Sequence, residues 1–482
     1  MARDDLKAAH HPGELKPPTR VKFFYSFGQM AQSGAFDTAI PFVFFYYTAV
    51  LGLSGAMVGA ALAISLCFDA VVDPLVGSWS DNFSSRFGRR IPLMMISAPL
   101  MGAALGLLFA PPGHLSTPLL FAWLTVASIA VRSLISLFNV PYIALGAEMA
   151  DGYVERSSVV AWRTVGGIVS GVSVTALAYA VFFAKPPGLL RADGYPGFGW
   201  SAALLLSGAA AVCGAGVMRY AASLPRAPTV AASIWRRLPT EVAEIFRNAS
   251  FRLLFFSAVI FYVAVGANAT LTSHSQIFVW KLQPWMMQVL GYIYLAGILL
   301  GVAISPLLSR GMEKKTVVIV GLLMIVLVWT VLPVLRAGGL YMPTGSAVLP
   351  PMGLNNFIGG TGVGFISIAY PSMMADAADE HEHLFGARRE GLYFSGLGFA
   401  GKAATGLGVL VGGLALDVIG FPHDAGRAGV VPSPAVLDRL ILAWGPGAAL
   451  VTVAAIIVFA PYAISRSRHD AIAAELRARR AG

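Results

Sequence analysis

Two carboxylates four residues apart lie in a segment that is otherwise apolar. Asp69 and Asp73 belong to the stretch 65–90, and their spacing puts both side chains on one face of a helix, about one turn apart. An acidic side chain at the centre of a bilayer costs at least ~2.5–3.5 kcal/mol, so two acids on one face require a cation or a proton that neutralises them. The pair therefore indicates a cation-binding site. The alternative is a pair of acids that line a water-filled crevice.

The composition indicates what kind of protein must position these acids. Of the 482 residues, 57% are hydrophobic and only 12% are charged, whereas a soluble protein has about 25% charged residues. Apolar runs repeatedly reach the ~20 residues that span a bilayer. We expect an all-α membrane protein whose twelve transmembrane helices form two pseudo-symmetric six-helix bundles. The predicted spans are roughly 21–51, 55–80, 91–111, 117–147, 159–184, 199–221, 251–281, 285–308, 315–336, 347–375, 391–420 and 435–464.

The basic residues predict the orientation of these spans. Lysine and arginine gather in the N-terminal tail, around residues 86–90, in the long segment 222–250 and in the C-terminal tail, whereas the alternate loops carry few. By the positive-inside rule both termini are cytoplasmic, in a bacterial-type inner (plasma) membrane. These loops explain the net charge of +10, which therefore does not indicate a nucleic-acid partner. Cys67 and Cys213 both fall in apolar spans, which predicts free thiols, no metal site and no bound cofactor.

Two pairs of stretches look like an internal repeat. Gly77–Arg90 and Gly301–Lys315 both run from a glycine through small residues to a basic turn, and 141–163 and 371–389 both leave a proline-containing span through an acidic and then basic loop. Repeats of this kind are typical of secondary transporters with binding sites near the membrane midplane. The predicted domains are an N-terminal bundle (1–221), a cytoplasmic linker with a short amphipathic helix (222–250), a C-terminal bundle (251–465) and a cytoplasmic tail (466–482).

The loop after the second span resembles the loop motif of the major facilitator superfamily. The motif positions are Gly77, Asp81, Gly88, Arg89 and Arg90. Five longer stretches resemble the glycoside–pentoside–hexuronide:cation symporter family, to which melibiose permease belongs. They are residues 68–81, 85–92, 139–149, 155–163 and 386–406. The resemblance covers essentially the whole chain and implies the major facilitator fold and cation-coupled transport.

The resemblance also implies roles for five residues inside the spans. It places the coupling cation on Asp69 and Asp73, and it assigns to the fourth span a polar residue that precedes a proline, here Asn139. An arginine of the fifth span matches Arg163. A lysine of the eleventh span matches Lys402, which would neutralise the acids when the cation is absent. The alternative for Lys402 is a side chain that snorkels to an interface.

Two departures from the family pattern bear on the substrate and the ion. Sugar-binding members have an acid where this chain has Asn139, and sodium-coupled members have an amide where it has Val72. Sodium requires several oxygen ligands, and the side chains of residues 70–72 provide none. A proton requires only a carboxylate whose pKa is raised by burial and a neighbouring like charge. We therefore favour a proton over sodium and keep both alternatives open.

The first span contributes a polar stripe that indicates a substrate site. Gln29, Ser33 and Asp37 recur at steps of four residues on an apolar helix, and Asp37 is an acid inside the membrane. We expect Asp37, Ser33 and Tyr142 to contact the substrate. The alternative for Asp37 is a buried acid paired with a basic side chain for structure. The alternative for Tyr142 is a hydrogen bond between helices.

Charged residues next to the spans predict ion pairs that hold one face of the transporter closed. We expect Asp81 to pair with Arg89 or Arg90, and Glu148 or Asp151 to pair with Arg156.

These patterns predict a membrane transporter rather than an enzyme, because the chain has no nucleotide-binding loop, nucleophile elbow or metalloprotease motif. We expect a monomeric, cation-coupled symporter of a sugar or glycoside that works by alternating access and contacts membrane lipid. An alternative cargo is a lysolipid or another amphiphile, because Ile143 stands one turn past Asn139, where a sugar site would place an aromatic residue.

Overall fold

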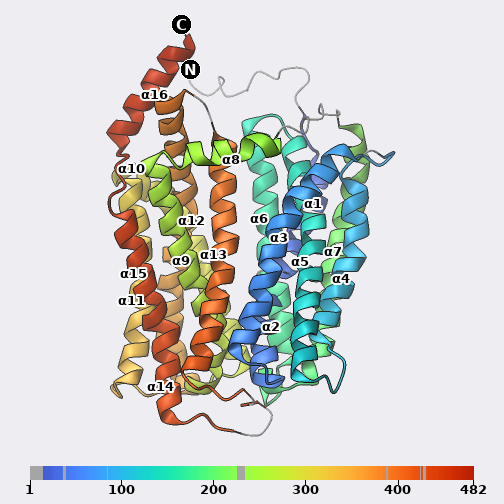
Figure 1. The fold of residues 1–482 in the computed structure, drawn as a ribbon, viewed down its shortest axis with the longest axis vertical. Coiled ribbons are helices and arrows are strands. Elements are labelled where there is room, and N and C mark those ends of the chain that lie inside the picture. Colours follow the sequence, from blue (N-terminus) through green and yellow to red (C-terminus); the bar gives the residue numbers. More distant parts are fainter. Residues whose placement is uncertain are drawn as a thin grey trace, which may run out of the picture. The chain divides into compact units, whose positions relative to one another are not determined.

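The structure is a computed structural model and is entirely helical in the part of the chain that it describes (Figure 1). The described residues are 15–35, 39–83, 85–224, 234–386, 389–423, 425–426 and 430–481. Eleven helical segments in that part are long and apolar enough to cross a membrane. The remaining predicted span, 21–51, contains α1 (Thr19–Ser33), α2 (Ala39–Phe45) and the π-helical turn η2 (Tyr46–Val50), which lie on either side of residues 36–38. The prediction of an all-α membrane protein is confirmed.

The contacts between residues divide the chain into two compact units. Unit 1 consists of Met1–Val43, Cys67–Ala178 and Asp193–Val230, and unit 2 consists of Phe44–Leu66, Tyr179–Ala192 and Ala231–Gly482. Helix α3 (Gly55–Asn82) contributes residues to both units. The predicted domain boundaries at residues 221 and 251 were drawn from composition alone and remain a prediction.

Unit 1 is built on α1 and four further long helices together with the second half of α3. The four helices are α4 (Ile91–Phe109), α5 (Thr117–Glu148), α6 (Tyr153–Ala176) and α7 (Gly194–Ser223). Helix α1 packs against α6 and α7, and α4 packs against α5 and α7. The first turn of α6 contains Glu155, an acid at the end where the helix dipole favours one, and Lys22 of α1 pairs with it at 2.5 Å.

Helix α2 is divided between the two units, whereas unit 2 contains all the helices that follow α7. They are α8 (Ile234–Ile245), α9 (Ala249–His274), α10 (Pro284–Gly311), α11 (Lys314–Ala337), α12 (Leu349–Phe385), α13 (Glu390–Val418), α14 (Pro434–Leu442), α15 (Ala448–Phe459) and α16 (Arg466–Ala481). Helices α10 and α12 approach each other closely through glycines. A Cβ added at Gly301 would lie 2.3 Å from the carbonyl oxygen of Thr361, so only glycine fits there.

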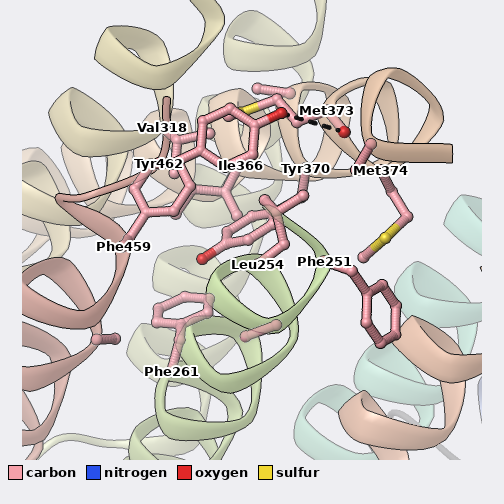
Figure 2. Packing of buried hydrophobic residues seen from close by; sticks show 14 of the residues in the cluster. Phe251, Leu254, Phe261, Val318, Ile366, Tyr370, Met373, Met374, Phe459 and Tyr462 are labelled. Carbon is pink, nitrogen blue, oxygen red and sulfur yellow. Dashed lines mark hydrogen bonds between the residues drawn. The ribbon is translucent and has the colours of Figure 1, made fainter. Parts of the chain in front are cut away.

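The core of unit 2 is formed by α9, α11, α12 and α15 (Figure 2). Leu254 and Phe261 of α9 pack with Ile366 and Tyr370 of α12, and Phe459 stacks on Tyr462 just after α15. The Tyr462 hydroxyl donates a hydrogen bond to the carbonyl of Met373 at 3.4 Å. Burial raises the pKa of Tyr462, and nearby Asp376 and Glu380 act in the same direction, so this phenol stays a neutral donor.

Two further helices of unit 2 are more polar than those of its core. Helix α8 is amphipathic, and helix α16 is polar. In Figure 1, α8 runs crosswise to α9 and α13, within the segment for which a short amphipathic helix was predicted. Arg389, just before α13, bonds to Glu241 and Glu244 of α8 at 2.9 and 3.4 Å. Helix α16 lies against α12.

The N-terminal half of α3 is anchored within unit 2 by an acid at the end of α13. The Asp417 carboxylate accepts hydrogen bonds from the backbone N–H groups of Gly55 and Ala56, both at 2.8 Å. An acid in the last turn of α13 opposes the dipole of that helix, whereas the same charge stabilises the N-terminus of α3. Nearby, the Thr48 hydroxyl lies 3.0 Å from Nε2 of the buried His274.

Candidate functional site

The two acids on α3 have different surroundings. Asp69 is buried with 4% of its surface exposed, and Asp73, one helical turn further along, is half-buried. The Ser136 hydroxyl of α5 donates a hydrogen bond of 2.6 Å to the Asp69 carboxylate. This hydrogen bond fixes the orientation of the Asp69 carboxylate against α5. The candidate ion site thus has one enclosed and one accessible carboxylate.

A buried arginine on α5 belongs to the same region and was missed by the sequence analysis. Arg132 is 6% exposed, and its guanidinium interacts electrostatically with Asp69. It lies one turn before Ser136, so both side chains share the α5 face that meets Asp69. The signal in the sequence is a single basic residue in the middle of the predicted span 117–147, at helical spacing from Asn139.

Asn139 lies on α5 one turn past Ser136. Its side chain is partly exposed, and its Oδ1 atom is buried without a hydrogen-bond partner among the described residues. A buried acceptor without a donor is costly, which makes this oxygen available to a ligand that donates a hydrogen bond. Its role in ion or substrate binding remains a prediction.

Arg163 links α6 to α1 through neutral groups. Its Nε and Nη2 atoms donate to Oε1 of Gln29 at 3.1 and 2.9 Å, and the guanidinium lies 5.5 Å from the ring centre of Tyr142. Gln29 in turn donates to the hydroxyl of Ser33 at 3.0 Å. The predicted polar stripe of the first span is therefore connected to the predicted arginine of the fifth.

Tyr142 is held in the core of unit 1. Its ring stacks on Tyr25 with a centroid distance of 4.4 Å. The Tyr142 hydroxyl donates to the carbonyl of Tyr25 at 3.0 Å, and the Tyr25 hydroxyl donates to the carbonyl of Tyr142 at 2.9 Å. Tyr142 is 0% exposed, so this geometry supports a packing role between α1 and α5. Its predicted contact with the substrate stays untested.

The other two predicted residues are Asp37 and Lys402. Asp37 is outside the described residues. Lys402 is half-buried near the middle of α13, twelve residues after Glu390, and belongs to unit 2. Its predicted exchange with the ion on Asp69 and Asp73 remains a prediction.

The loop motif forms a compact network of charges in unit 1. Arg90 pairs with Asp81 at 2.8 Å and with Glu148 at 2.7 Å, and it donates to the Ser80 hydroxyl at 2.8 Å. Arg89 also pairs with Glu148, at 2.7 Å. Gly77 is half-buried on α3. Gly88 has a positive φ of 89°, a backbone conformation that favours glycine and turns the chain into α4.

The predicted ion pair between Glu148 or Asp151 and Arg156 differs from the pairing in the structure. Glu148 pairs with Arg89 and Arg90 rather than with Arg156. Arg156 donates to the carbonyl of Ala150, and Asp151 accepts from the backbone N–H of Leu15 at 3.1 Å. The basic start of α4 reaches the acidic end of α5 because these helices pack side by side, a contact that sequence proximity does not reveal.

Comparison with known families decides what kind of protein carries these groups. The chain matches the model of the MFS/sugar transport protein family over residues 24–466. It belongs to this family. This member of the MFS/sugar transport family is therefore an integral membrane transporter and not an enzyme, as the sequence predicts.

Similar proteins within and beyond the family agree with this assignment. The transporter is 24% identical to the isoprimeverose transporter of Lactiplantibacillus pentosus over 86% of this chain and 85% of the relative. It is 26% identical to the putative glycoside/cation symporter YagG of Escherichia coli, over only 33% of this chain and 34% of the relative. The fold is similar to that of the solved nucleoside transporter NupG, with a TM-score of 0.59 at 15% identity over 92% of this chain and 99% of that one. The predicted major facilitator fold is confirmed.

Proposed function

We propose that this transporter couples the movement of a sugar or glycoside to that of a cation, with a proton favoured over sodium, by alternating access. The observation that carries the proposal is the pair of acids on α3, Asp69 buried against Ser136 and Asp73 half-buried one turn away. Intramembrane acids are costly and are kept where they bind or transfer a cation. Two relatives, an isoprimeverose transporter and a putative glycoside/cation symporter, support this substrate class.

In this mechanism the ion and the substrate stabilise each other's binding. A cation at the α3 acids releases Lys402 from its acidic partner, and the substrate binds between Asn139, Ser33, Asp37 and neighbouring groups. Arg163 holds α6 to α1 around that space. Because coupling between two sites is reciprocal, the substrate tightens cation binding by the same factor. In this proposal both termini lie on the cytoplasmic side of the inner membrane, so the loop-motif network closes the cytoplasmic face.

A second candidate cargo is a lysolipid or another amphiphile. Ile143, one turn past Asn139 on α5, is 44% exposed, so an apolar surface adjoins the polar group. A sugar ring is usually met there by an aromatic residue, whereas an acyl chain needs an apolar one.

Uptake into proteoliposomes tests the proposal. The purified protein is assayed with labelled isoprimeverose, a panel of other glycosides and a lysophospholipid, each with an inward pH gradient, an inward sodium gradient or neither. We expect glycoside accumulation that requires a gradient, and its loss in Asp73→Asn with counterflow retained. Asp438→Asn, on the exposed face of α14, is the matched control and should leave accumulation unchanged. Accumulation of the lysophospholipid alone supports the second cargo, and gradient-independent flux contradicts cation coupling.

A further inference from the structure

Arg163 is an intramembrane base that makes no ion pair in the part of the chain that the structure describes. It lies ten residues after Tyr153, the start of α6, which is about 15 Å along the helix. Its guanidinium donates to the amide of Gln29 and lies 5.5 Å from the ring centre of Tyr142, and both groups are neutral. An uncompensated charge at this depth is costly, which makes the position suitable for an anion.

Other basic side chains at the helix contacts of unit 1 have carboxylate partners. Lys22 of α1 pairs with Glu155 of α6, and Arg90 of the loop motif pairs with Glu148 of α5. The bundle thus supplies acids where a base joins two helices, and among the described residues it supplies none to Arg163. A base that the protein leaves uncompensated inside the membrane indicates a binding position rather than a structural contact.

Gln29 holds the guanidinium of Arg163 by one edge. The Nε and Nη2 atoms both donate to Oε1 of Gln29, at 3.1 and 2.9 Å. Because arginine only donates, the amide oxygen must face it, and the amide nitrogen then donates to Gln32 and, at 3.0 Å, to the hydroxyl of Ser33. The other edge of the guanidinium, formed by Nη1 and Nη2, keeps the parallel N–H groups that bind both oxygens of a carboxylate.

Two glycines follow Arg163 on its face of α6. They are Gly167 and Gly171, at steps of four residues. A Cβ added at Gly167 would lie 3.4 Å from Oγ of Ser33, and a Cβ added at Gly171 would meet nothing within 4 Å. Arg163 itself is half-buried. A ligand whose acidic group meets the guanidinium therefore has room along α6, next to the hydroxyl of Ser33.

We propose that Gln29 is a positioning residue that presents the open Nη1–Nη2 edge of Arg163, still charged, to an acidic group of the substrate. The transporter then selects sugar derivatives that carry a carboxylate over neutral ones of the same size. This inference rests on the proposed function and deepens it, because it specifies the charge of the substrate. The neutral amide is essential, since it orients the guanidinium without neutralising it.

The first experiment compares ligands that differ in charge and hardly in size. Purified wild-type protein is titrated by calorimetry with glucuronate, galacturonate and gluconate, and with the uncharged amide of each. We expect at least one acid to bind about tenfold more tightly than its amide, because a bidentate bond between two charged groups is stronger than a bond to a neutral one. Equal affinity for acid and amide overturns the inference. The measurement needs no ion gradient, so it is independent of cation coupling.

The second experiment places an acid where the amide now stands. Gln29→Glu puts a carboxylate at the atom that accepts from Arg163, so the guanidinium is neutralised within the protein. We expect the affinity for the acid to fall about tenfold, the affinity for the amide to change less than about threefold, and the thermal midpoint in detergent to stay or rise. Arg163→Gln should lose the same preference. A folded Gln29→Glu protein that still prefers the acid overturns the inference.

The control for these variants is a base outside the site. Arg439→Gln, on the exposed face of α14, should leave both affinities unchanged. In proteoliposomes, gradient-driven uptake of a sugar acid but not of its amide supports the inference. Gradient-driven uptake of isoprimeverose or of a lysophospholipid without uptake of any acid overturns it, although cation coupling stands. If no glycoside or sugar acid responds to a gradient, the proposed function fails, and the calorimetric comparison still decides the charge preference.

Discussion

The loop networks of the two units are built from corresponding helices. In unit 1, Arg89 and Arg90 at the start of α4 pair with Glu148 at the end of α5. In unit 2, Lys314 at the start of α11 pairs with Asp376 near the end of α12, with the closest oxygen at 2.6 Å. Both pairs fall in the stretches that look repeated in the sequence. The same pairing at the same place in each unit supports a common origin of the two halves.

The two networks differ in what completes them. In unit 1, Asp81 of α3 adds a third helix to the network through Arg90. The corresponding helix α10 has no acid, and there the C-terminal helix α16 supplies the missing contacts. Arg466 donates to the carbonyls of Ser309 and Arg310, and Arg468 pairs with Glu380 at 2.7 Å. Unit 1 therefore completes its network from its own bundle, whereas unit 2 depends on an appended segment.

A second difference lies in the middle of the helices. Helix α3 carries Asp69 and Asp73 and faces Arg132 of α5, but α10 has no charged residue before Arg310. The repeat thus accounts for the scaffold and the end networks, and of the two corresponding helices α3 and α10 only α3 carries a pair of acids in its middle. Four changes would break or sharpen this comparison.

The largest effect is expected from removing the centre of the unit 1 network. Arg90 has a side chain 7% exposed and contacts Asp81, Ser80 and Glu148. Arg90→Ala removes the buried partner of Asp81, which is exposed, and of Glu148, which keeps Arg89, so we expect a loss of about 2 kcal/mol of stability, measured by thermal unfolding in detergent, and reduced uptake. Arg86→Ala, at an exposed position in the same loop, is the control and should change little. Equal losses of stability in Arg90→Ala and Arg86→Ala would show that the ion pairs of Arg90 do not stabilise the protein.

Removing α16 should have the next largest effect. A chain that ends at residue 465 leaves Glu380, whose side chain is 4% exposed, without Arg468. Since Arg468 itself is 51% exposed, we expect about 1–2 kcal/mol from the whole deletion, measured as the thermal midpoint, and less from Arg468→Ala. Arg477→Ala, whose side chain donates to the carbonyl of Ala473 within α16, is the control. A truncated protein as stable as the full chain would show that unit 2 does not depend on this helix.

The Lys314–Asp376 pair should contribute less than the Arg90 network. The Lys314 side chain is 35% exposed, so water weakens its attraction to Asp376. A double-mutant cycle with Lys314→Ala and Asp376→Ala should give a coupling energy of about 1 kcal/mol. The equivalent cycle with Arg90→Ala and Glu148→Ala should give a larger value. A reversed order would refute the ranking of the two networks.

The smallest expected effect is the difference in stability between alanine substitutions at two glycines, Gly88 and Gly386. Gly88 precedes α4 with φ of 89°, and Gly386 follows α12 with φ of 75°. Alanine at either position adopts a left-handed conformation that costs about 1 kcal/mol. A Cβ at Gly88 would also lie 3.3 Å from the carbonyl oxygen of Ala221, whereas a Cβ at Gly386 would meet nothing within 4 Å. We expect Gly88→Ala to be destabilised by about 0.5 kcal/mol more than Gly386→Ala. Thermal unfolding in detergent should therefore give Gly88→Ala the lower midpoint of the two variants.

Features set by periodicity and local spacing were predictable from the sequence. The helical membrane fold follows from the apolar runs, and the Asp81–Arg90 pair follows from a motif within fourteen residues. Features set by packing between helices were not. The choice of Glu148 between Arg90 and Arg156 depends on how α4 meets α5, and the contact of Arg132 with Asp69 joins residues 63 positions apart. The tail 466–482 was predicted without a helix, because nothing local shows that α12 provides acids for it.

The reciprocal hydrogen bonds between Tyr25 and Tyr142 join α1 to α5, and we expect the two helices to move together. Each backbone is held by the other helix's side chain, so a sliding motion between them would break two buried bonds at once. Spin labels at the exposed positions Phe23 and Ile143 would therefore keep one separation throughout turnover. Such a pair provides an internal ruler against which the displacement of any other labelled helix in this transporter can be calibrated.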